Sequence, residues 1–306
     1  MAITNQTTIK PFIKWAGGKT QLLKTFDSKY PVELKQGKIK NYYEPFLGGG
    51  AVCFDILSKY EVENIYLFDL NEDLILTYRV VQCKPENLIG LLLKYQKHYS
   101  KLNQKERIEY YYRVRKNYNT TKGVNYNKYT DSWVERASQM IFLNKTCFNG
   151  LYRLNKNGEF NVPYGDYKNP KIVDPQNLLN VSEKLSRAEI KVADFGVLLD
   201  QIKSDSFVYF DPPYRPISKT SSFNAYSKLE FNDASQIRLA EVFKKLASGN
   251  TKLMLSNSDP KNFNSEDCFF DKLYEDFNIE RVLASRAINS NGANRGKINE
   301  ILIKNY

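Results

Sequence analysis

Histidine and paired cysteines are almost absent from this chain. Of its 306 residues one is a histidine, His98, and four are cysteines, none of them in a C-x-x-C pair. Ser–His and Cys–His triads, histidine-rich metal sites and C-x-x-C zinc sites therefore lack the residues that they need. We expect no metal ion, a solvated helix-face position for His98, and ordinary thiols at Cys53, Cys83, Cys147 and Cys268.

Long apolar runs are also absent. No stretch approaches the roughly 20 apolar residues that a membrane-spanning helix needs. The opening MAITNQTTIKPF has no apolar core of the signal-peptide kind. We therefore expect a cytoplasmic protein without membrane contacts. The length of 306 residues suits one large domain or two unequal ones, and we expect two. We also expect a monomer or weak dimer.

The glycine turn near the N-terminus is an incomplete P-loop. KWAGGKT, residues 14–20, ends in the Gly-Lys-Thr of a P-loop, but the glycine required five positions before Gly18 is replaced by Ile13. A nucleoside triphosphatase would need that glycine. We expect this turn to serve another ligand.

A second glycine turn, EPFLGGGAVCFDI at 44–56, follows a strand-like run. Glycines in a strand-to-helix turn let a ligand approach the backbone. Asp69 lies 21 positions after Gly48, where an acidic residue can bind ribose hydroxyls. Cys53 replaces the third glycine of a dinucleotide fingerprint, so a nucleoside without pyrophosphate fits better. S-adenosylmethionine is therefore the expected cofactor. The alternative is that the glycine turn only connects a strand to a helix and binds no ligand.

The tetrapeptide Asp-Pro-Pro-Tyr at 211–214 follows the strand-like run SFVYF. Ligands of open α/β sheets bind at the carboxyl ends of strands. Asp211 and the Pro212 carbonyl can accept both hydrogens of one exocyclic amine, while Tyr214 stacks beneath a planar ring. Acceptors placed in this way orient the nitrogen for methyl transfer. A rigid turn that ends a strand is the alternative.

Short apolar runs predict strands that alternate with helices. These runs lie at 41–46, 64–69, 189–194, 206–211 and 252–257. Their alternation with helical patterns predicts a mostly parallel sheet in an α/β domain. At the C-terminal end, 280–288 and 299–306 are expected to pair as antiparallel strands.

Basic residues are concentrated in one mainly helical segment. Residues 72–172 hold 18 Lys plus Arg against 9 Asp plus Glu, and 12 of the 22 tyrosines. Cations among flat aromatic rings suit a nucleic acid, whereas a solubilising surface with half-buried tyrosines is the alternative. We predict that 72–172 is a helical domain inserted between the two parts, 1–71 and 173–306, of the α/β domain.

Several segments together resemble the Dam-type DNA adenine-N6 methyltransferases, the alpha group or D12 class. These segments are FIKWAGGKTQLL, EPFLGGGAVCFDI, LFDLNEDLI, FLNKTCFNGLYRLNKNGEFNVPYGDYKNP, VYFDPPYRPIS and LSNS. The resemblance covers nearly the whole chain and is strongest to restriction-modification methylases that act on GATC. It implies a Rossmann-like S-adenosylmethionine-dependent sheet, an inserted helical target-recognition domain, double-stranded DNA as substrate, and an adenine flipped out of the duplex.

The resemblance also implies roles for individual residues. The catalytic residues are Asp211, Pro212 and Tyr214. The cofactor residues are Trp15, Ala16, Lys19, Phe46, Gly48, Asp69, Asp194, Phe195 and Asp211. The DNA residues are Lys14, Phe148, Asn149, Leu151, Arg153, Pro163 and Tyr167. The loop 215–231 is expected to close over the flipped base.

The recognised DNA sequence stays open between GATC and a longer or different site. Arg153 is expected to read a guanine, Leu151 to contact a thymine methyl, and Phe148 to wedge into the duplex; core packing is the alternative for the last two. Asp166 stands where the family commonly has arginine. A cognate restriction endonuclease acting on the same site is an implied partner, and a solitary methylase is the alternative. An RNA or protein amine methyltransferase is the competing function.

Overall fold

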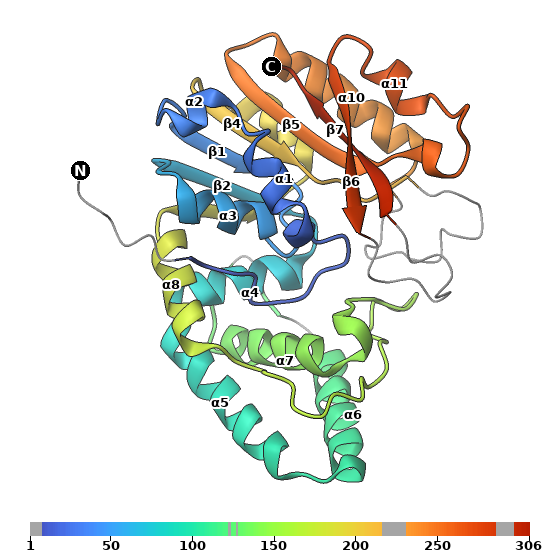
Figure 1. Ribbon diagram of the computed structural model, residues 1–306. Helices are drawn as coiled ribbons and strands as arrows, with labels where there is room; N and C mark the ends of the chain where they lie inside the picture. The colour runs from blue at the N-terminus through green and yellow to red at the C-terminus, as the bar shows by residue number, and fades with distance from the viewer. Residues whose placement is uncertain (1–7, 122–123, 127, 216–230, 286–296) are drawn as a thin grey trace.

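A seven-stranded sheet forms the upper half of the molecule as drawn in Figure 1. The computed structural model describes residues 8–121, 124–126, 128–215, 231–285 and 297–306. The strands are β1 (Asn41–Glu44), β2 (Asn64–Asp69), β3 (Ala188–Val192), β4 (Ser206–Phe210), β5 (Thr251–Ser258), β6 (Asn278–Ser285) and β7 (Lys297–Lys304). They lie in the order β3-β2-β1-β4-β5-β7-β6. Strands β1 to β5 are parallel, and β7 is antiparallel to both β5 and β6.

The predicted strands and the predicted α/β fold class, a Rossmann-like methyltransferase sheet, are confirmed. The parallel strands match the predicted runs, and β6 and β7 form the predicted antiparallel pair. Strand ends differ by a few residues. The run 189–194, for example, leaves the sheet after Val192, because Asp194 caps the short helix η3 (Phe195–Val197) by accepting a hydrogen bond from Gly196 N at 2.9 Å.

The order of the strands creates a crevice beside β1. Because β1 lies between β2 and β4, the chain winds outward on both sides of it. Ligands of open α/β sheets bind at such a switch point, outside the carboxyl ends of the strands. Phe46 follows β1 and Asp211 follows β4, so both leave the sheet at this edge.

Helices cover both faces of the sheet. Tyr42 and Tyr43 of β1 point to opposite faces, where one packs with residues of α3 and the other with residues of α10. Eight of the described α-helices lie outside the group α5 to α7, which is described below. They are α1 (Leu23–Asp27), α2 (Val32–Lys35), α3 (Ala51–Lys59), α4 (Glu72–Cys83), α8 (Pro175–Leu185), α9 (Leu198–Gln201), α10 (Asp233–Ala247) and α11 (Phe269–Leu273). Short 3-10 helices are η1 (Lys19–Gln21), η2 (Phe148–Gly150) and η5 (Pro260–Asn262).

Three helices form the lower part of the molecule (Figure 1): α5 (Pro85–Lys101), α6 (Gln104–Thr120) and α7 (Ser132–Thr146). A buried carboxylate joins two of them, α6 and α7, to α4. Asp73 of α4 accepts two hydrogen bonds from the Arg136 guanidinium of α7 and one from the Tyr118 hydroxyl of α6 at 2.8 Å. A charged group can be buried in this way because it is paired and hydrogen-bonded. The division into two domains stays a prediction.

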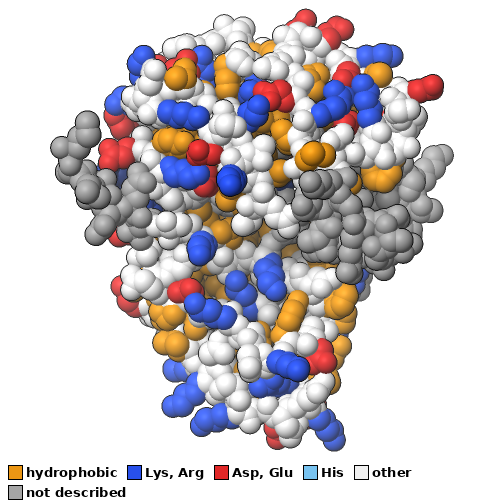
Figure 2. Space-filling view, in the orientation of Figure 1, with side chains coloured by type: hydrophobic (Ala, Val, Ile, Leu, Met, Phe, Trp, Pro, Cys, Tyr) orange, Lys and Arg blue, Asp and Glu red, His pale blue; other side chains and the backbone are white. Residues whose placement is uncertain are grey.

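The tyrosines of the basic segment are largely engaged within the protein. Five of them are buried: Tyr78, Tyr99, Tyr111, Tyr118 and Tyr152. On α6, Arg113 lies 4.9 Å from the ring centre of Tyr110, and Arg115 lies 4.6 Å from that of Tyr112. Figure 2 shows more Lys and Arg than Asp and Glu side chains on the lower part of this face. The excess of cations is therefore on the surface, while many of the rings serve packing.

The remaining predictions concern His98, the cysteines, membrane spans, metal sites and the loop 215–231. His98 is exposed on α5, as expected, and all four cysteines are free thiols. Within the described ranges no helix is long and apolar enough to cross a bilayer. No cluster of His, Cys, Asp and Glu in the same part of the chain can hold a metal ion. The predicted closing loop, 215–231, lies almost entirely outside the described residues.

Candidate active site

A buried ammonium group joins the first glycine turn to the Asp-Pro-Pro-Tyr segment. Lys19 Nζ donates hydrogen bonds to Asp211 Oδ1 at 2.6 Å, to Gly17 O at 2.9 Å and to the Tyr214 hydroxyl at 3.1 Å. Glu300 of β7 lies on the other side, with Oε2 at 3.9 Å from Nζ. We call Lys19, Asp211, Tyr214 and Glu300 the Lys19 cluster. It brings together three predicted site residues and one that was not predicted.

Opposite charges in this cluster decide its ionisation. Burial alone lowers the pKa of Lys19, but the nearby charges of Asp211 and Glu300 outweigh burial, so the pKa of Lys19 is raised and its ammonium is kept. Burial raises the pKa of Asp211, although Lys19 and the Ser256 hydroxyl oppose that shift. The Ser256 hydroxyl donates to Asp211 Oδ1 at 3.2 Å. Both bonded partners therefore occupy the same oxygen of Asp211.

The second glycine turn and Asp69 form one unit beside Trp15. Gly48 N donates to Asp69 Oδ2 at 3.0 Å, and Asn71 N donates to Oδ1 at 2.9 Å. Gly48 has φ +47°, and a Cβ there would lie 2.8 Å from Trp15 Cδ1. Only glycine meets both conditions, since positive φ and close approach exclude a side chain. Burial raises the pKa of the Asp69 carboxyl.

Aromatic rings from two loops meet at the same edge of the sheet. The ring centre of Phe46 lies 5.5 Å from that of Phe195. The guanidinium of Arg238 lies 4.2 Å above the Phe195 ring and forms an ion pair with Asp194. Apolar ring faces bordered by a charged pair suit a planar heterocycle with polar edges.

Two further predicted residues lie in this neighbourhood. Pro212 is buried directly after Asp211, and Ala16 is half-buried beside Trp15. The structure thus brings Lys19, Asp211 and Tyr214 into contact, and it places Trp15, Gly48 and Asp69 in a second contacting group. The cofactor role of each of these residues stays a prediction.

Glu44 and Glu300 are the acidic residues of this edge that sequence reasoning missed. Glu44 ends β1, is 2% exposed, and accepts a hydrogen bond from the Tyr42 hydroxyl at 2.5 Å. Burial raises the pKa of both carboxyls. A signal existed for Glu44, since it is the first residue of the quoted EPFLGGG motif. Glu300 comes from an antiparallel strand whose place in the sheet the sequence does not reveal.

The predicted DNA residues lie around the N-terminal turn and η2. The Asn144 side chain clamps Lys14 by accepting from its N and donating to its O, both at 2.8 Å, and it donates to Gly150 O at 3.0 Å. The Lys14 ammonium lies 4.7 Å from the ring centre of Tyr167. Phe148 N donates to Pro163 O at 2.9 Å.

The side chains of this group differ in exposure. Phe148 is 52% exposed, and its exposed neighbour Asn149 has a positive φ of 55°. Leu151 is half-buried and packs against the apolar core, so core packing contributes to its role. Arg153 Nε donates to Asn161 Oδ1 at 2.8 Å. Asp166, which departs from the family pattern, accepts from Gln104 Nε2 at 3.1 Å.

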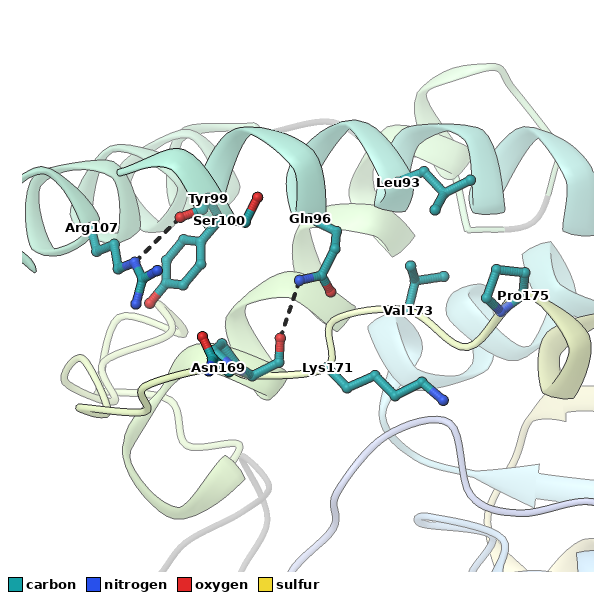
Figure 3. Close-up of a pocket in the computed structure, with 10 residues that line it drawn as sticks. Leu93, Gln96, Tyr99, Ser100, Arg107, Asn169, Lys171, Val173 and Pro175 are labelled. Carbon is teal, nitrogen blue, oxygen red and sulfur yellow. Dashed lines mark hydrogen bonds between the residues drawn. The ribbon is translucent and has the colours of Figure 1, made fainter. Parts of the chain in front are cut away.

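A separate surface pocket lies between α5 and the segment 169–175 (Figure 3), and none of its lining residues belongs to the Lys19 cluster. Its polar groups pair with one another. Gln96 donates to Pro170 O at 3.3 Å and accepts from Ile172 N at 2.7 Å, while Arg107 donates to Tyr99 O and to Lys168 O. These bonds fasten the segment to α5, and we assign no ligand to the pocket.

Comparisons with known proteins agree with this geometry. The model of the D12 class N6 adenine-specific DNA methyltransferases matches residues 15–288. The type II methyltransferase M.MjaIII of Methanocaldococcus jannaschii is 52% identical over 97% of this chain and 99% of its own length. M1.LlaDCHI, a type II methyltransferase of Lactococcus lactis subsp. cremoris, is 39% identical over 99% and 97%.

A third relative is the DNA adenine methylase of Vibrio cholerae, 32% identical over 96% of this chain and 95% of that protein. The chain therefore spans nearly the full length of all three relatives. It belongs to the D12 class N6 adenine-specific DNA methyltransferases and is an enzyme that methylates adenine in DNA.

Proposed function

We propose that the enzyme flips an adenine out of double-stranded DNA and methylates its N6 nitrogen, with Asp211, Pro212 and Tyr214 around that nitrogen. The observation that carries this proposal is the pairing of Asp211. Lys19 and Ser256 both bond Oδ1, and Oδ2 has no hydrogen-bond partner among the residues described. Oδ2 is therefore available to an amine that enters the crevice.

The chemistry of the site fits an amine. The lone pair of the adenine amino nitrogen is delocalised into the base, which makes this nitrogen a poor nucleophile. Asp211 Oδ2 and the Pro212 carbonyl would each accept one of its hydrogens, and this favours a more tetrahedral, more nucleophilic nitrogen. The Tyr214 ring stacks beneath the base and orients it. Once methylated, the nitrogen must lose a proton, and the raised pKa of the Asp211 carboxyl suits it to accept that proton.

The residues of the crevice fit S-adenosylmethionine, the cofactor that the family and fold imply. Each Asp69 oxygen accepts one backbone hydrogen bond, and carboxylate oxygens have capacity left for ribose hydroxyls. We infer that Phe46, Phe195 and Asp194 hold the adenine of the cofactor, and that Trp15, Ala16, Lys19 and Gly48 border its methionine arm. When bound, the cofactor supplies the methyl group, which is attached to its positively charged sulfonium sulfur.

We infer GATC as the target. Arg153 Nε is held by Asn161, and an arginine fork fixed in this way suits a bidentate contact to guanine. Leu151 would contact a thymine methyl and exposed Phe148 would enter the duplex, while Lys14, Asn149, Pro163 and Tyr167 border the outer base pair and backbone. Asp166 cannot supply the phosphate or base contact of an arginine, which keeps a longer or different site as the alternative.

A restriction-modification role is proposed from the relatives named type II methyltransferases. A cognate endonuclease would act on the same site without a stable complex. The relative from Vibrio cholerae is named only DNA adenine methylase, without the type II designation, and a solitary role is the alternative.

Sequencing the modified bases of DNA from a host that expresses the protein tests this function. We expect N6-methyladenine at GATC with the natural enzyme, and none with Asp211→Ala, although that variant still binds a GATC duplex. Methylation at another sequence would show that the target is not GATC, while the proposed adenine methylation would stand. Methylation that persists with Asp211→Ala would refute the role of Asp211.

A further inference from the structure

Glu300 is a buried carboxylate beside Lys19, in addition to the half-buried Asp211, and the proposed reaction does not use it. Glu300 is 7% exposed. Its Oε1 accepts a hydrogen bond from the Tyr214 hydroxyl at 2.8 Å. Its Oε2 lies 3.9 Å from Lys19 Nζ and, within the described part of the chain, is buried without a hydrogen-bond partner. A buried charge with an unbonded oxygen is costly, so a compensating use is expected.

Donor and acceptor rules fix the Tyr214 hydroxyl. A lysine ammonium only donates, so the Tyr214 oxygen must accept from Lys19 at 3.1 Å. The hydroxyl proton must then point at the acceptor on its other side, Glu300 Oε1. Glu300 therefore keeps this proton away from Asp211 and holds the phenol in one orientation.

Charge gives Glu300 a second effect. Asp211 and Glu300 share one ammonium, so the ionised Lys19 cluster has one negative charge in excess. A purely structural role explains the presence of the Glu300 carboxylate poorly. Buried ion pairs add little to folding stability, and replacing them by apolar residues often leaves that stability unchanged. An excess negative charge at the carboxyl edge of the sheet instead favours a cation bound there, such as the sulfonium of the cofactor.

We propose that Glu300 is a positioning residue of the methyl-transfer site, which acts through Tyr214 and Lys19 to leave Asp211 Oδ2 free for the target amine and to keep the site attractive to a cationic cofactor. This role rests on the proposed function. It assigns to β7 a part in the Lys19 cluster, whose other residues come from the N-terminal turn and the segment after β4.

The variant Glu300→Gln tests the proposal, because the amide oxygen still accepts from Tyr214 while the charge is lost. Glu280→Gln is the matched control: Glu280 lies on the neighbouring strand β6 and pairs with Lys304 at 2.6 Å, away from Lys19. In single-turnover methylation of a GATC duplex, Glu300→Gln is expected to lower the rate about tenfold, with DNA affinity unchanged. Glu280→Gln should leave both unchanged.

A double-mutant cycle identifies the route. The cycle uses Glu300→Leu, which removes the acceptor of the Tyr214 hydroxyl as well as the charge. If Glu300 acts through Tyr214, then Glu300→Leu combined with Tyr214→Phe should be about as slow as the slower single variant, since both substitutions remove the same hydrogen bond. Rates that multiply, giving about a hundredfold loss from two tenfold losses, overturn the proposal.

Cofactor binding supplies a readout that needs no methylation. Calorimetry with S-adenosylmethionine, which is cationic at sulfur, and S-adenosylhomocysteine, which is not, should show that Glu300→Gln weakens only the first, by about fivefold. An unchanged affinity ratio overturns the proposal. Failure of the natural enzyme to methylate DNA would instead refute the proposed function, and the calorimetric result would still decide the role of Glu300.

Discussion

Trp15 stacks on Tyr152, with ring centres 5.3 Å apart and ring planes inclined by 23°. Trp15 also covers Gly48 of the second glycine turn. Tyr152 stands between Leu151 and Arg153, and its hydroxyl donates to Asp73 at 3.4 Å. One indole ring thus contacts the turn proposed for the cofactor and the segment proposed for DNA. The first glycine turn, which suggested a phosphate site, is in a position to couple the two ligands.

We predict that Tyr152→Leu weakens this coupling. An aromatic pair contributes about 1 kcal/mol beyond its buried area, so its loss should change a binding ratio by about fivefold. The measurement is the DNA affinity with and without S-adenosylhomocysteine. The ratio of the two affinities should move toward unity in Tyr152→Leu, whereas Tyr152→Phe, which retains the stack, should keep the natural ratio. Equal ratios in all three proteins would disprove the coupling.

Gly48→Ala is expected to damage both stability and cofactor binding. The added Cβ would lie 2.8 Å from Trp15 Cδ1, and the backbone φ of +47° is unfavourable for alanine. Such strain costs about 1 to 3 kcal/mol. Chemical denaturation and calorimetry with S-adenosylhomocysteine measure the two effects.

Gly90→Ala is the matched control for Gly48. A Cβ at Gly90, on the exposed side of α5, meets nothing within 4 Å. Alanine should stabilise the helix there by about 0.5 to 1 kcal/mol and leave cofactor affinity unchanged. Similar effects of the two substitutions would contradict a special role for the backbone of Gly48.

The sequence predicted the strands better than the site. Apolar runs bounded by turns identified the central strands β1 and β4 most clearly, because these are buried on both faces. The family resemblance assigned Lys19 and Asp211, 192 positions apart, to one cofactor pocket, but their direct hydrogen bond was not predicted. Glu300 was missed because its approach to Tyr214 depends on the lateral order β4-β5-β7, which apolar patterns do not encode.

The basic segment illustrates another limit of composition. Counts of cations and tyrosines favoured free stacking rings, but Tyr111 and Tyr118 are buried and Arg113 already stacks on Tyr110. Burial of a ring depends on which helix faces it, and composition contains no such information. The excess of positive charge was the sounder part of that prediction, because Lys and Arg side chains need only be exposed in order to attract a nucleic acid.

Lys145 is predicted to make DNA affinity depend on pH. Burial, together with the charge of Lys14, lowers the pKa of Lys145 to about 8. A bound phosphate favours the ammonium form, so affinity should fall as pH rises from about 7 to 9. The slope of log affinity against log salt should become shallower by about 0.9 over the same range. Lys145→Met should abolish both changes, and exposed Lys156→Met should retain them.

The same lowered pKa of Lys145 predicts a stability effect with a definite sign. Between about pH 8 and the ordinary lysine pKa near 10.4, the unfolded chain holds a proton that the folded chain has released. Stability should therefore rise with pH in this window, relative to Lys145→Met. Identical stability curves for the two proteins would show that Lys145 is not perturbed.

Arg153 is predicted to discriminate bases rather than to supply general affinity. With Nε held by Asn161 at 2.8 Å, its remaining donors suit one guanine, a contact that is worth about 1 to 3 kcal/mol against a wrong base. Arg153→Ala should therefore reduce the methylation rate on GATC while sparing duplexes in which that guanine is already replaced. Arg113→Ala removes an equal charge from α6, where the guanidinium stacks on Tyr110, and should affect all duplexes alike. Competitive methylation of GATC and singly substituted duplexes measures the difference. If Arg153→Ala slows every duplex by the same factor, Arg153 contacts the backbone, and recognition of guanine must come from another residue of the segment around η2.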